Sequence, residues 1–199
     1  MEELEFIRPP SVSLRLLERT AEIGFTMASE TRTGALLRAL AASKPGGRLL
    51  ELGTGTGVAT AWLLDGMDAS SQLISIDPDG GVQRIARETF ERDARLHLVT
   101  ENAERFLERQ PPASFDLVFA DAMAGKYERL EKALAVVRVG GFYVVDDLLP
   151  QPNWPQGHAD RVPLLMRELA SHPEYTVVPM AWASGIVVAV RTKALVPRG

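Results

Sequence analysis

Short runs of apolar residues alternate along the chain with stretches in which apolar residues recur at helical spacing. Such alternation is typical of a parallel β-sheet that is covered by helices. Five of the runs have the length of buried strands and lie at residues 48–52, 72–77, 95–100, 115–121 and 142–147. The pattern therefore predicts an α/β fold in which helices connect successive strands.

Helical spacing is clearest in two of the stretches between these runs. The first has apolar residues at Val82, Ile85, Ala86 and Phe90, and the second has them at Tyr127, Leu130, Leu134 and Val137. The sequence RVGG at 138–141 predicts the end of the second helix and a turn before the next strand. Two more helices are expected near 12–24 and 30–42, ahead of the first strand.

The alternation stops after residue 147. Residues 148–158 contain three prolines and are expected to form an ordered loop, followed by a helix that turns Val162, Leu165, Met166 and Leu169 inward. The last two runs, 175–180 and 185–190, are joined by only AWAS, which is too short for a crossover helix, so we expect an antiparallel hairpin. The prediction is a Rossmann-like, seven-stranded, mostly parallel sheet with helices on both faces.

Composition narrows the classes of function. No linker or repeat divides the chain, so we expect a single domain over 1–194, with LVPRG at 195–199 as the remnant of a protease site and tag. The net charge of −4 argues against a nucleic-acid partner. The chain has no cysteine, no leader-like apolar stretch at its start and no run long enough to span a membrane. We expect a cytoplasmic protein.

A glycine-rich loop, LLELGTGTGVAT at 49–60, follows the first predicted strand. It lacks the lysine and hydroxyl residue of a phosphate-binding P-loop, and the dinucleotide pattern G-x-G-x-x-G fails whichever glycine it starts from. What remains is Glu51 followed by Gly53, Gly55 and Gly57. An acid in that position would repel a pyrophosphate and attract an ammonium group. The loop therefore favours a zwitterionic ligand.

This loop resembles the first motif of class I S-adenosylmethionine-dependent methyltransferases. The segments FADAMAGKY and VVDDLLP resemble, more narrowly, the catechol and caffeoyl-CoA O-methyltransferase group. The resemblance extends over residues 25–193, and the segment FTMASETRTGALL and the closing hairpin also match that group. Glu51 and the glycines would surround the methionine moiety, and Asp77 would hold the ribose hydroxyls. The positions that the resemblance places on the cofactor side are Met27, Ser29, Gly34, Glu51, Gly53, Gly55, Gly57, Asp77, Asn102, Ala103, Asp121 and Met123.

The resemblance also implies a divalent cation. Metal-dependent members hold it with acids that correspond here to Asp121, Asp146 and Asp147, the last replacing a usual amide. Independently, acids at the ends of neighbouring parallel strands, about 4.8 Å apart, can converge on one ion, and oxygen ligands favour Mg²⁺, Mn²⁺ or Ca²⁺. Alternatively, Asp146 or Asp147 caps a turn and Asp121 bonds the adenosine.

The sequence leaves the catalytic base open between two residues. Relatives place a lysine three residues after the first metal-binding aspartate, but Ala124 stands there. Lys126 and His158 are the two candidates for the base. The alternative for each residue is a solvated position on the surface with no role in catalysis. Trp154 and Trp182 either wall an aromatic pocket or belong to the core, and the core is favoured for Trp182.

The leading hypothesis is a cation-assisted O-methyltransferase that acts on a small catechol-like or phenolic acceptor. Methylation of a hydroxylated uridine in tRNA is an alternative that the acidic balance disfavours. A protein that binds S-adenosylmethionine without turnover is another, motivated by Ala124 and Asp147. A nicotinamide-dependent oxidoreductase is disfavoured by the failed fingerprint, and a homodimer is expected from the resemblance only.

Overall fold

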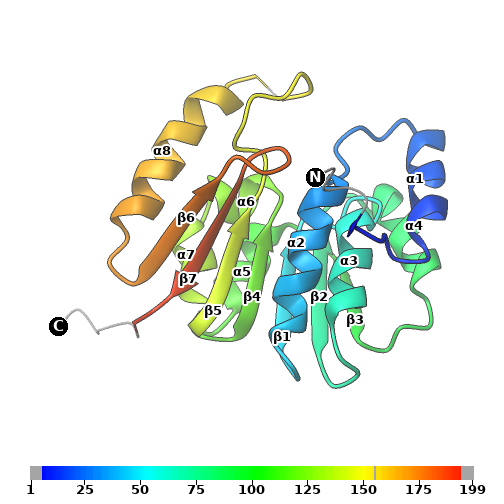
Figure 1. Ribbon diagram of the computed structural model, residues 1–199, viewed down its shortest axis with the longest axis horizontal. Coiled ribbons are helices and arrows are strands. Elements are labelled where there is room, and N and C mark those ends of the chain that lie inside the picture. Colours follow the sequence, from blue (N-terminus) through cyan, green and yellow to red (C-terminus); the bar gives the residue numbers. More distant parts are fainter. Residues whose placement is uncertain (1–5, 155, 194–199) are drawn as a thin grey trace.

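The computed structural model describes residues 6–154 and 156–193, which form one seven-stranded sheet in the order β3-β2-β1-β4-β5-β7-β6 (Figure 1). The strands are β1 Arg48–Leu52, β2 Gln72–Asp77, β3 Leu96–Thr100, β4 Phe115–Ala120, β5 Val137–Val145, β6 Tyr175–Met180 and β7 Ile186–Arg191. The first five pair in parallel, whereas β7 pairs antiparallel with both β5 and β6. The predicted fold class is confirmed, while the proposed tag remnant lies outside the described residues.

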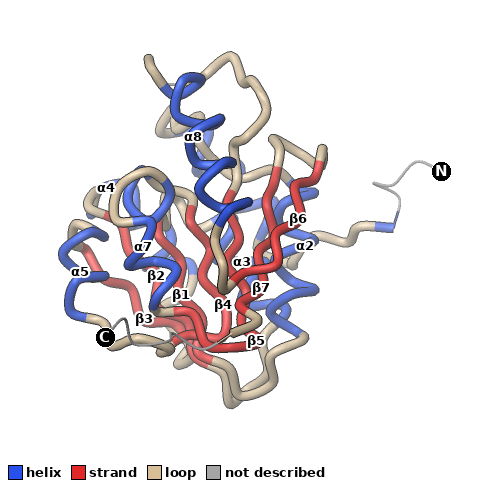
Figure 2. The backbone as a smooth tube through the Cα atoms, turned by 90° about the vertical axis from the view of Figure 1, so that its left-hand side faces the viewer, coloured by secondary structure: helices blue, strands red, loops and turns tan. Residues whose placement is uncertain are grey.

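Helices cover both faces of the sheet (Figure 2). They are α1 Ser13–Glu22, α2 Thr31–Ala42, α3 Val58–Gly66, α4 Gly80–Thr89, α5 Ala103–Arg109, α6 Met123–Lys126, α7 Leu130–Ala135 and α8 His158–Ser171. One face packs against α2 and α3, and the opposite face packs against α5, α7 and α8. None of the helices in the described part of the chain is long and apolar enough to cross a membrane.

The continuous apolar runs of the central strands are explained by burial on both sides. In β4, Leu117 and Phe119 belong to the cluster beneath α2 and α3, whereas Val118 and Ala120 belong to the cluster beneath α5 and α7. All four side chains are fully buried. Since each large apolar side chain contributes roughly 1.5–3 kcal/mol on burial, both faces stabilise the strand.

Three local predictions around β5 were wrong. The RVGG segment at 138–141 is part of β5 rather than a turn, and β5 ends at Val145, so Asp146 and Asp147 follow the strand. Val137, expected on a helix, is buried in β5, and the register with β4 is irregular between Phe115 and Leu117. The helix shortens because Arg129 adopts a left-handed backbone, with φ of 61°, directly before α7.

The topology gathers polar residues at one edge of the sheet. Strand β2 ends in Asp77, whereas Asp121 directly follows β4 and Asp146 directly follows β5. Val145 pairs with Val187 at the start of β7, so the hairpin connection before β7 lies at the same edge. Ligands of open α/β sheets bind outside these strand ends.

Candidate functional site

The glycine loop requires glycine for both conformation and space. Gly53, Gly55 and Gly57 have φ of 102°, 52° and 93°. A Cβ at Gly53 would lie 2.5 Å from the carbonyl oxygen of Asp121, and one at Gly57 would lie 2.8 Å from the Cβ of Ala86. The left-handed backbone disfavours L side chains, and these short distances exclude them. The loop therefore presents bare backbone beside the end of β4.

Asp77 fixes the loop from the end of β2. One carboxylate oxygen accepts the amide hydrogen of Gly55 at 2.8 Å, and the other accepts that of Asp79 at 2.9 Å. Each oxygen keeps a further lone pair, and the side chain is only half-buried. Asp77 can therefore shape the loop and still accept hydrogen bonds from a ligand.

Glu51 lies behind the loop and has no exposed surface. One carboxyl oxygen accepts from the Thr60 hydroxyl at 2.6 Å and from the Ser75 hydroxyl at 2.5 Å. The other oxygen has no hydrogen-bond partner within the described residues. Burial raises the pKa of Glu51 to about 8, because two neutral hydroxyl donors do not replace the water that the carboxylate loses. Glu51 supports the loop from below and lines neither of the cavities described next.

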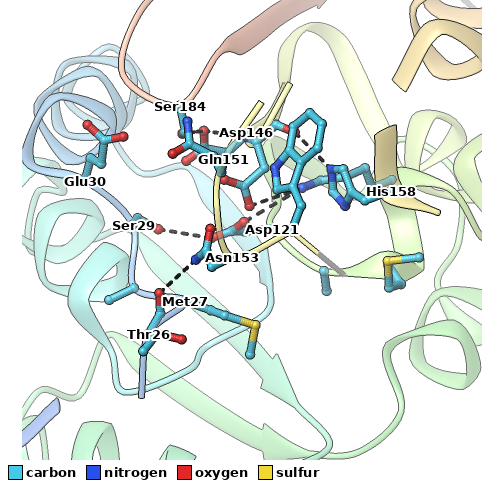
Figure 3. A pocket seen from close by; sticks show the side chains of 16 residues that line it. Thr26, Met27, Ser29, Glu30, Asp121, Asp146, Gln151, Asn153, His158 and Ser184 are labelled. Carbon is cyan, nitrogen blue, oxygen red and sulfur yellow. Dashed lines mark hydrogen bonds and ion pairs between the residues drawn. The ribbon is translucent and has the colours of Figure 1, made fainter. Parts of the chain in front are cut away.

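Two adjoining cavities open at this edge of the sheet. The loop cavity, about 280 Å³, is lined by Gly53, Gly55, Asp77 and neighbouring residues. The carboxylate cavity, about 320 Å³, is lined by the acids after β4 and β5 and by Gln151, Asn153, Trp154 and His158 (Figure 3). The walls that both cavities share are Met27, Ala28, Ser29, Asp121 and Ala122. Two small ligands bound in them would therefore lie next to each other.

The predicted acids do converge in the carboxylate cavity. Asp121 accepts a hydrogen bond from Ser29 at 3.0 Å, and Asp146 accepts from the hydroxyl of Ser184 and, at 2.7 Å, from the amide of Asp147 (Figure 3). Burial is the main cause that raises the pKa of both Asp121 and Asp146 above the ordinary range. Asp147 has φ of 60°, a conformation that Asp and Asn tolerate better than most residues. The backbone at this position is therefore compatible with an aspartate.

Lys126 takes the centre of this cluster. Its side chain is only 4% exposed, and its Nζ lies 3.9 Å from an oxygen of Asp121 and 3.9 Å from an oxygen of Asp147. The nearby ammonium opposes the rise in pKa of Asp121. The surface alternative for Lys126 is wrong, because the side chain is buried among carboxylates.

The expected metal site does not fit this arrangement. Within 6–154 and 156–193, no group of three or more His, Cys, Asp or Glu side chains is placed to hold an ion. Asp121 and Asp146 each have one oxygen that accepts hydrogen bonds from the protein, and these bonds fix the direction in which each carboxylate points. The second oxygen of Asp121 and one oxygen of Asp147 each lie 3.9 Å from the Lys126 ammonium, so a cation bound between them would meet a like charge.

His158 begins α8 and lies in the cavity wall, stacked on Trp154 with ring centroids 4.4 Å apart. Its Nε2 is 3.0 Å from the carbonyl oxygen of Asp147 and 3.0 Å from the hydroxyl of Tyr127. Because a carbonyl oxygen can only accept, Nε2 carries the hydrogen. His158 thus holds the backbone of Asp147, and only Nδ1 is left for the predicted role of base.

Other predicted positions divide between the cavities and their surroundings. Met27 lines both cavities and Met123 lines the carboxylate cavity. Asn102 caps α5 by accepting from Glu104 and Arg105, and neither it nor Ala103 lines a cavity, so their place on the cofactor side stays a prediction.

Two positions from the sequence lie in the core instead. Gly34 packs against Trp62, where a Cβ would lie 2.3 Å from the indole ring, and it lines neither cavity, so its place on the cofactor side stays a prediction. Trp182 packs against the core and donates to the carbonyl of Arg32 at 3.0 Å, as favoured from the sequence.

Sequence reasoning missed Ser184 and Asn153. Ser184 lies in the hairpin connection and bonds Asp146, and Asn153 donates to the carbonyl of Thr26 at 3.0 Å across the cavity (Figure 3). The position of Ser184 could have been predicted from the antiparallel hairpin. A strand that pairs antiparallel with β5 begins beside the end of β5, so the connection that precedes this strand lies there too. Nothing in the sequence indicated the contact of Asn153.

The chain is similar to known O-methyltransferases. Residues 50–148 match the model of a family described as a methyltransferase domain. A Mycobacterium tuberculosis protein named "Probable O-methyltransferase" is 36% identical over 133 residues, which are 64% of this chain and 59% of that relative. The chain therefore spans about six tenths of the length of the curated relatives it matches.

Solved structures share the fold. A Bacillus cereus O-methyltransferase in complex with SAH superposes with a TM-score of 0.80 at 20% identity, covering 94% of this chain and 93% of that one. TomG, an O-methyltransferase of tomaymycin synthesis from Streptomyces achromogenes in complex with SAM, gives 0.79 at 21% identity, covering 94% and 92%.

Proposed function

Because the chain belongs to the class I S-adenosylmethionine-dependent methyltransferases, we propose that it transfers the methyl group of S-adenosylmethionine to a hydroxyl of a small acceptor. The observation that carries this proposal is the pair of adjoining cavities. The glycine loop lines one and the carboxylates line the other, and Asp121 belongs to the wall of both. A donor in the first and an acceptor in the second would meet at this wall.

The loop cavity is suited to the donor. The bare backbone at Gly53 and Gly55 allows the methionine portion to approach closely. The Asp77 carboxylate has lone pairs left for the two ribose hydroxyls, and such charge-assisted hydrogen bonds are stronger than neutral ones. The relatives with SAM or SAH in their structures support the same donor.

The carboxylate cavity is suited to a catechol-like or phenolic acceptor. Trp154 and Met27 supply apolar surface for a ring, while Asp147 and Lys126 supply polar groups for its hydroxyls. The Asp147 side chain is 40% exposed and so remains accessible to a ligand. A cavity with a few polar groups among apolar ones fixes the orientation of a small ligand.

The proposed reaction is a single displacement. A lone pair of the acceptor oxygen forms the new bond to the methyl carbon as the bond from carbon to sulfur breaks, and that electron pair neutralises the sulfonium. The hydroxyl proton passes to the Asp147 carboxylate. The Lys126 ammonium donates a hydrogen bond to the acceptor oxygen and stabilises its developing negative charge. The protein contributes mainly by positioning the two reactants.

The test is a methyl-transfer assay with S-adenosylmethionine and a panel of catechols and simple phenols, read by mass spectrometry. We expect at least one panel member to gain a methyl ether, with formation of S-adenosylhomocysteine. Asp147→Ala should reduce the rate by about 10²-fold or more, in line with loss of a general base. Tight binding of the donor without transfer to any hydroxylated acceptor would contradict the proposal.

A further inference from the structure

The buried Lys126 is the feature of the site that the family resemblance does not explain. Its ammonium lies among the carboxylates of Asp121, Asp146 and Asp147, at 3.9 Å from the first and the last. A buried ammonium is costly unless opposite charges surround it, and the buried carboxylates of Asp121 and Asp146 are costly without a cation nearby. The lysine and the acids therefore compensate one another.

The backbone before Lys126 is built to turn it inward. Ala124 has an extended conformation, and Gly125 has φ of 85°, so the chain reverses within α6. Tyr143 donates a hydrogen bond to the carbonyl of Gly125 at 2.7 Å, and a Cβ at Gly125 would lie 2.3 Å from Leu52. This reversal lets a lysine five residues after Asp121 reach the cluster, although Ala124 stands where relatives carry lysine.

The orientation of the acids agrees with an ammonium as the resident cation. Ser29 holds one oxygen of Asp121, and Ser184 and the Asp147 amide hold one oxygen of Asp146. The other oxygen of Asp121 and an oxygen of Asp147 both face Lys126. A divalent ion bound between those two oxygens would lie against the ammonium, and like charges repel at that distance.

We propose that Lys126 supplies the positive charge that a divalent cation supplies in metal-dependent relatives, and that the site of this protein works without a metal. Its catalytic consequence rests on the proposed function: the ammonium donates to the acceptor oxygen. The placement of the charge does not depend on that function. It can therefore be tested in the absence of any methyl transfer.

The experiment is to titrate the intact protein with Mn²⁺ and follow the free ion by electron paramagnetic resonance. The wild-type protein should bind no Mn²⁺ at an ion concentration of about 1 mM, which corresponds to the weakest dissociation constants of carboxylate sites. Lys126→Ala should bind one Mn²⁺ per chain, because removal of the ammonium leaves the carboxylates uncompensated. Lys126→Gln should do the same and serves if the alanine variant does not fold.

Lys132→Ala is the matched control, since Lys132 is exposed on α7 and its loss changes the net charge equally. It should behave as the wild type does. Stoichiometric Mn²⁺ binding by the wild-type protein would overturn the proposal, and so would folded Lys126 variants that bind no Mn²⁺. Neither result depends on whether the acceptor has been identified, so failure here is separate from failure of the proposed function.

In the methyl-transfer assay, a chelator should leave the wild-type rate unchanged, whereas Lys126→Ala should lose activity and Lys126→Arg should regain part of it. Loss of the wild-type rate in chelator, restored by Mg²⁺, would also overturn the proposal. Absence of transfer in every condition would contradict the proposed function instead, and the Mn²⁺ titration would still decide the role of Lys126.

Discussion

Glu51 shows how a single buried group can couple the glycine loop to pH. Its carboxyl is buried beneath the loop and accepts a hydrogen bond from Ser75. The Ser75 hydroxyl also bonds the hydroxyl of Thr54 at 2.7 Å, and Thr54 accepts from the amide of Gln83 at 3.0 Å, so Glu51 is linked to the loop by a hydrogen-bond network. The ordinary pKa of 4.5 applies in the unfolded chain, whereas burial raises the pKa of Glu51 to about 8 in the fold. The folded protein therefore retains a proton that the unfolded chain releases.

From this shift we predict that stability falls as pH rises. The contribution of Glu51 is fully present below pH 4.5 and is lost as pH rises towards 8. The full shift corresponds to at most about 5 kcal/mol. Glu51→Gln keeps the shape of the protonated acid, so denaturant unfolding between pH 5 and 9 should show a flatter profile and a variant that is more stable than wild type at the alkaline end. Parallel profiles for the two proteins would contradict a protonated Glu51.

Among short elements, the loop from β1 to α3 depends most strictly on glycine. Gly53→Ala adds a Cβ only 2.5 Å from the Asp121 carbonyl, so the end of β4 has to move. Gly24→Ala is the control, because Gly24 has φ of 66° but nothing within 4 Å of an added Cβ. We expect Gly24→Ala to cost about 1 kcal/mol from backbone strain alone and Gly53→Ala to cost roughly 3 kcal/mol or more. Thermal unfolding measures both, and equal costs would mean that the close approach is relaxed in solution.

The same elements show where sequence reasoning succeeds. The ranges 48–52 and 72–77 match β1 and β2, because strands that are buried on both faces are rich in apolar residues with few polar interruptions. The stretch after β4 could not be predicted in detail. Its helix is interrupted by left-handed residues at Gly125 and Arg129, and Arg129 carries no sequence signal for that conformation. Tertiary contacts, such as Tyr143 with Gly125, determine it.

Across the whole molecule, the carboxylate cavity is closed by segments that are far apart in sequence. The segment before α2 and the loop before α8 meet where Asn153 donates to the carbonyl of Thr26 at 3.0 Å (Figure 3). Asn153→Ala should raise the KM for the acceptor by about 2–10-fold, the worth of one hydrogen bond, and should leave the melting temperature nearly unchanged because the contact is exposed. Gln156→Ala, an exposed neighbour in the same loop, should change neither quantity. An unchanged KM for Asn153→Ala would show that this contact does not shape the cavity.

For the whole molecule, the sequence predicted which strand ends lie close together. It did not predict which loops contribute residues to the site at those strand ends. Asp77, Asp121 and Asp146 could be placed together because parallel strands end at one edge of the sheet. Ser184 and Asn153 reach the site through a hairpin connection and a proline-rich loop, whose paths depend on packing. The lysine was named as a candidate, but its burial among the acids became visible only in the structure.

The measurement that tests the central claim most directly is a calorimetric titration of the protein with S-adenosylmethionine, repeated on Asp77→Asn. We predict one site per chain in the wild type. Loss of the charged acceptor in Asp77→Asn should weaken binding by about 10–100-fold, the worth of charge-assisted hydrogen bonds. The amide oxygen can still accept from Gly55, while the bond from the exposed amide of Asp79 is lost, so the melting curve of Asp77→Asn has to match that of the wild type for the comparison to count. No binding heat in the wild type, or equal affinities in the two folded proteins, would contradict a methyl-donor site at the glycine loop.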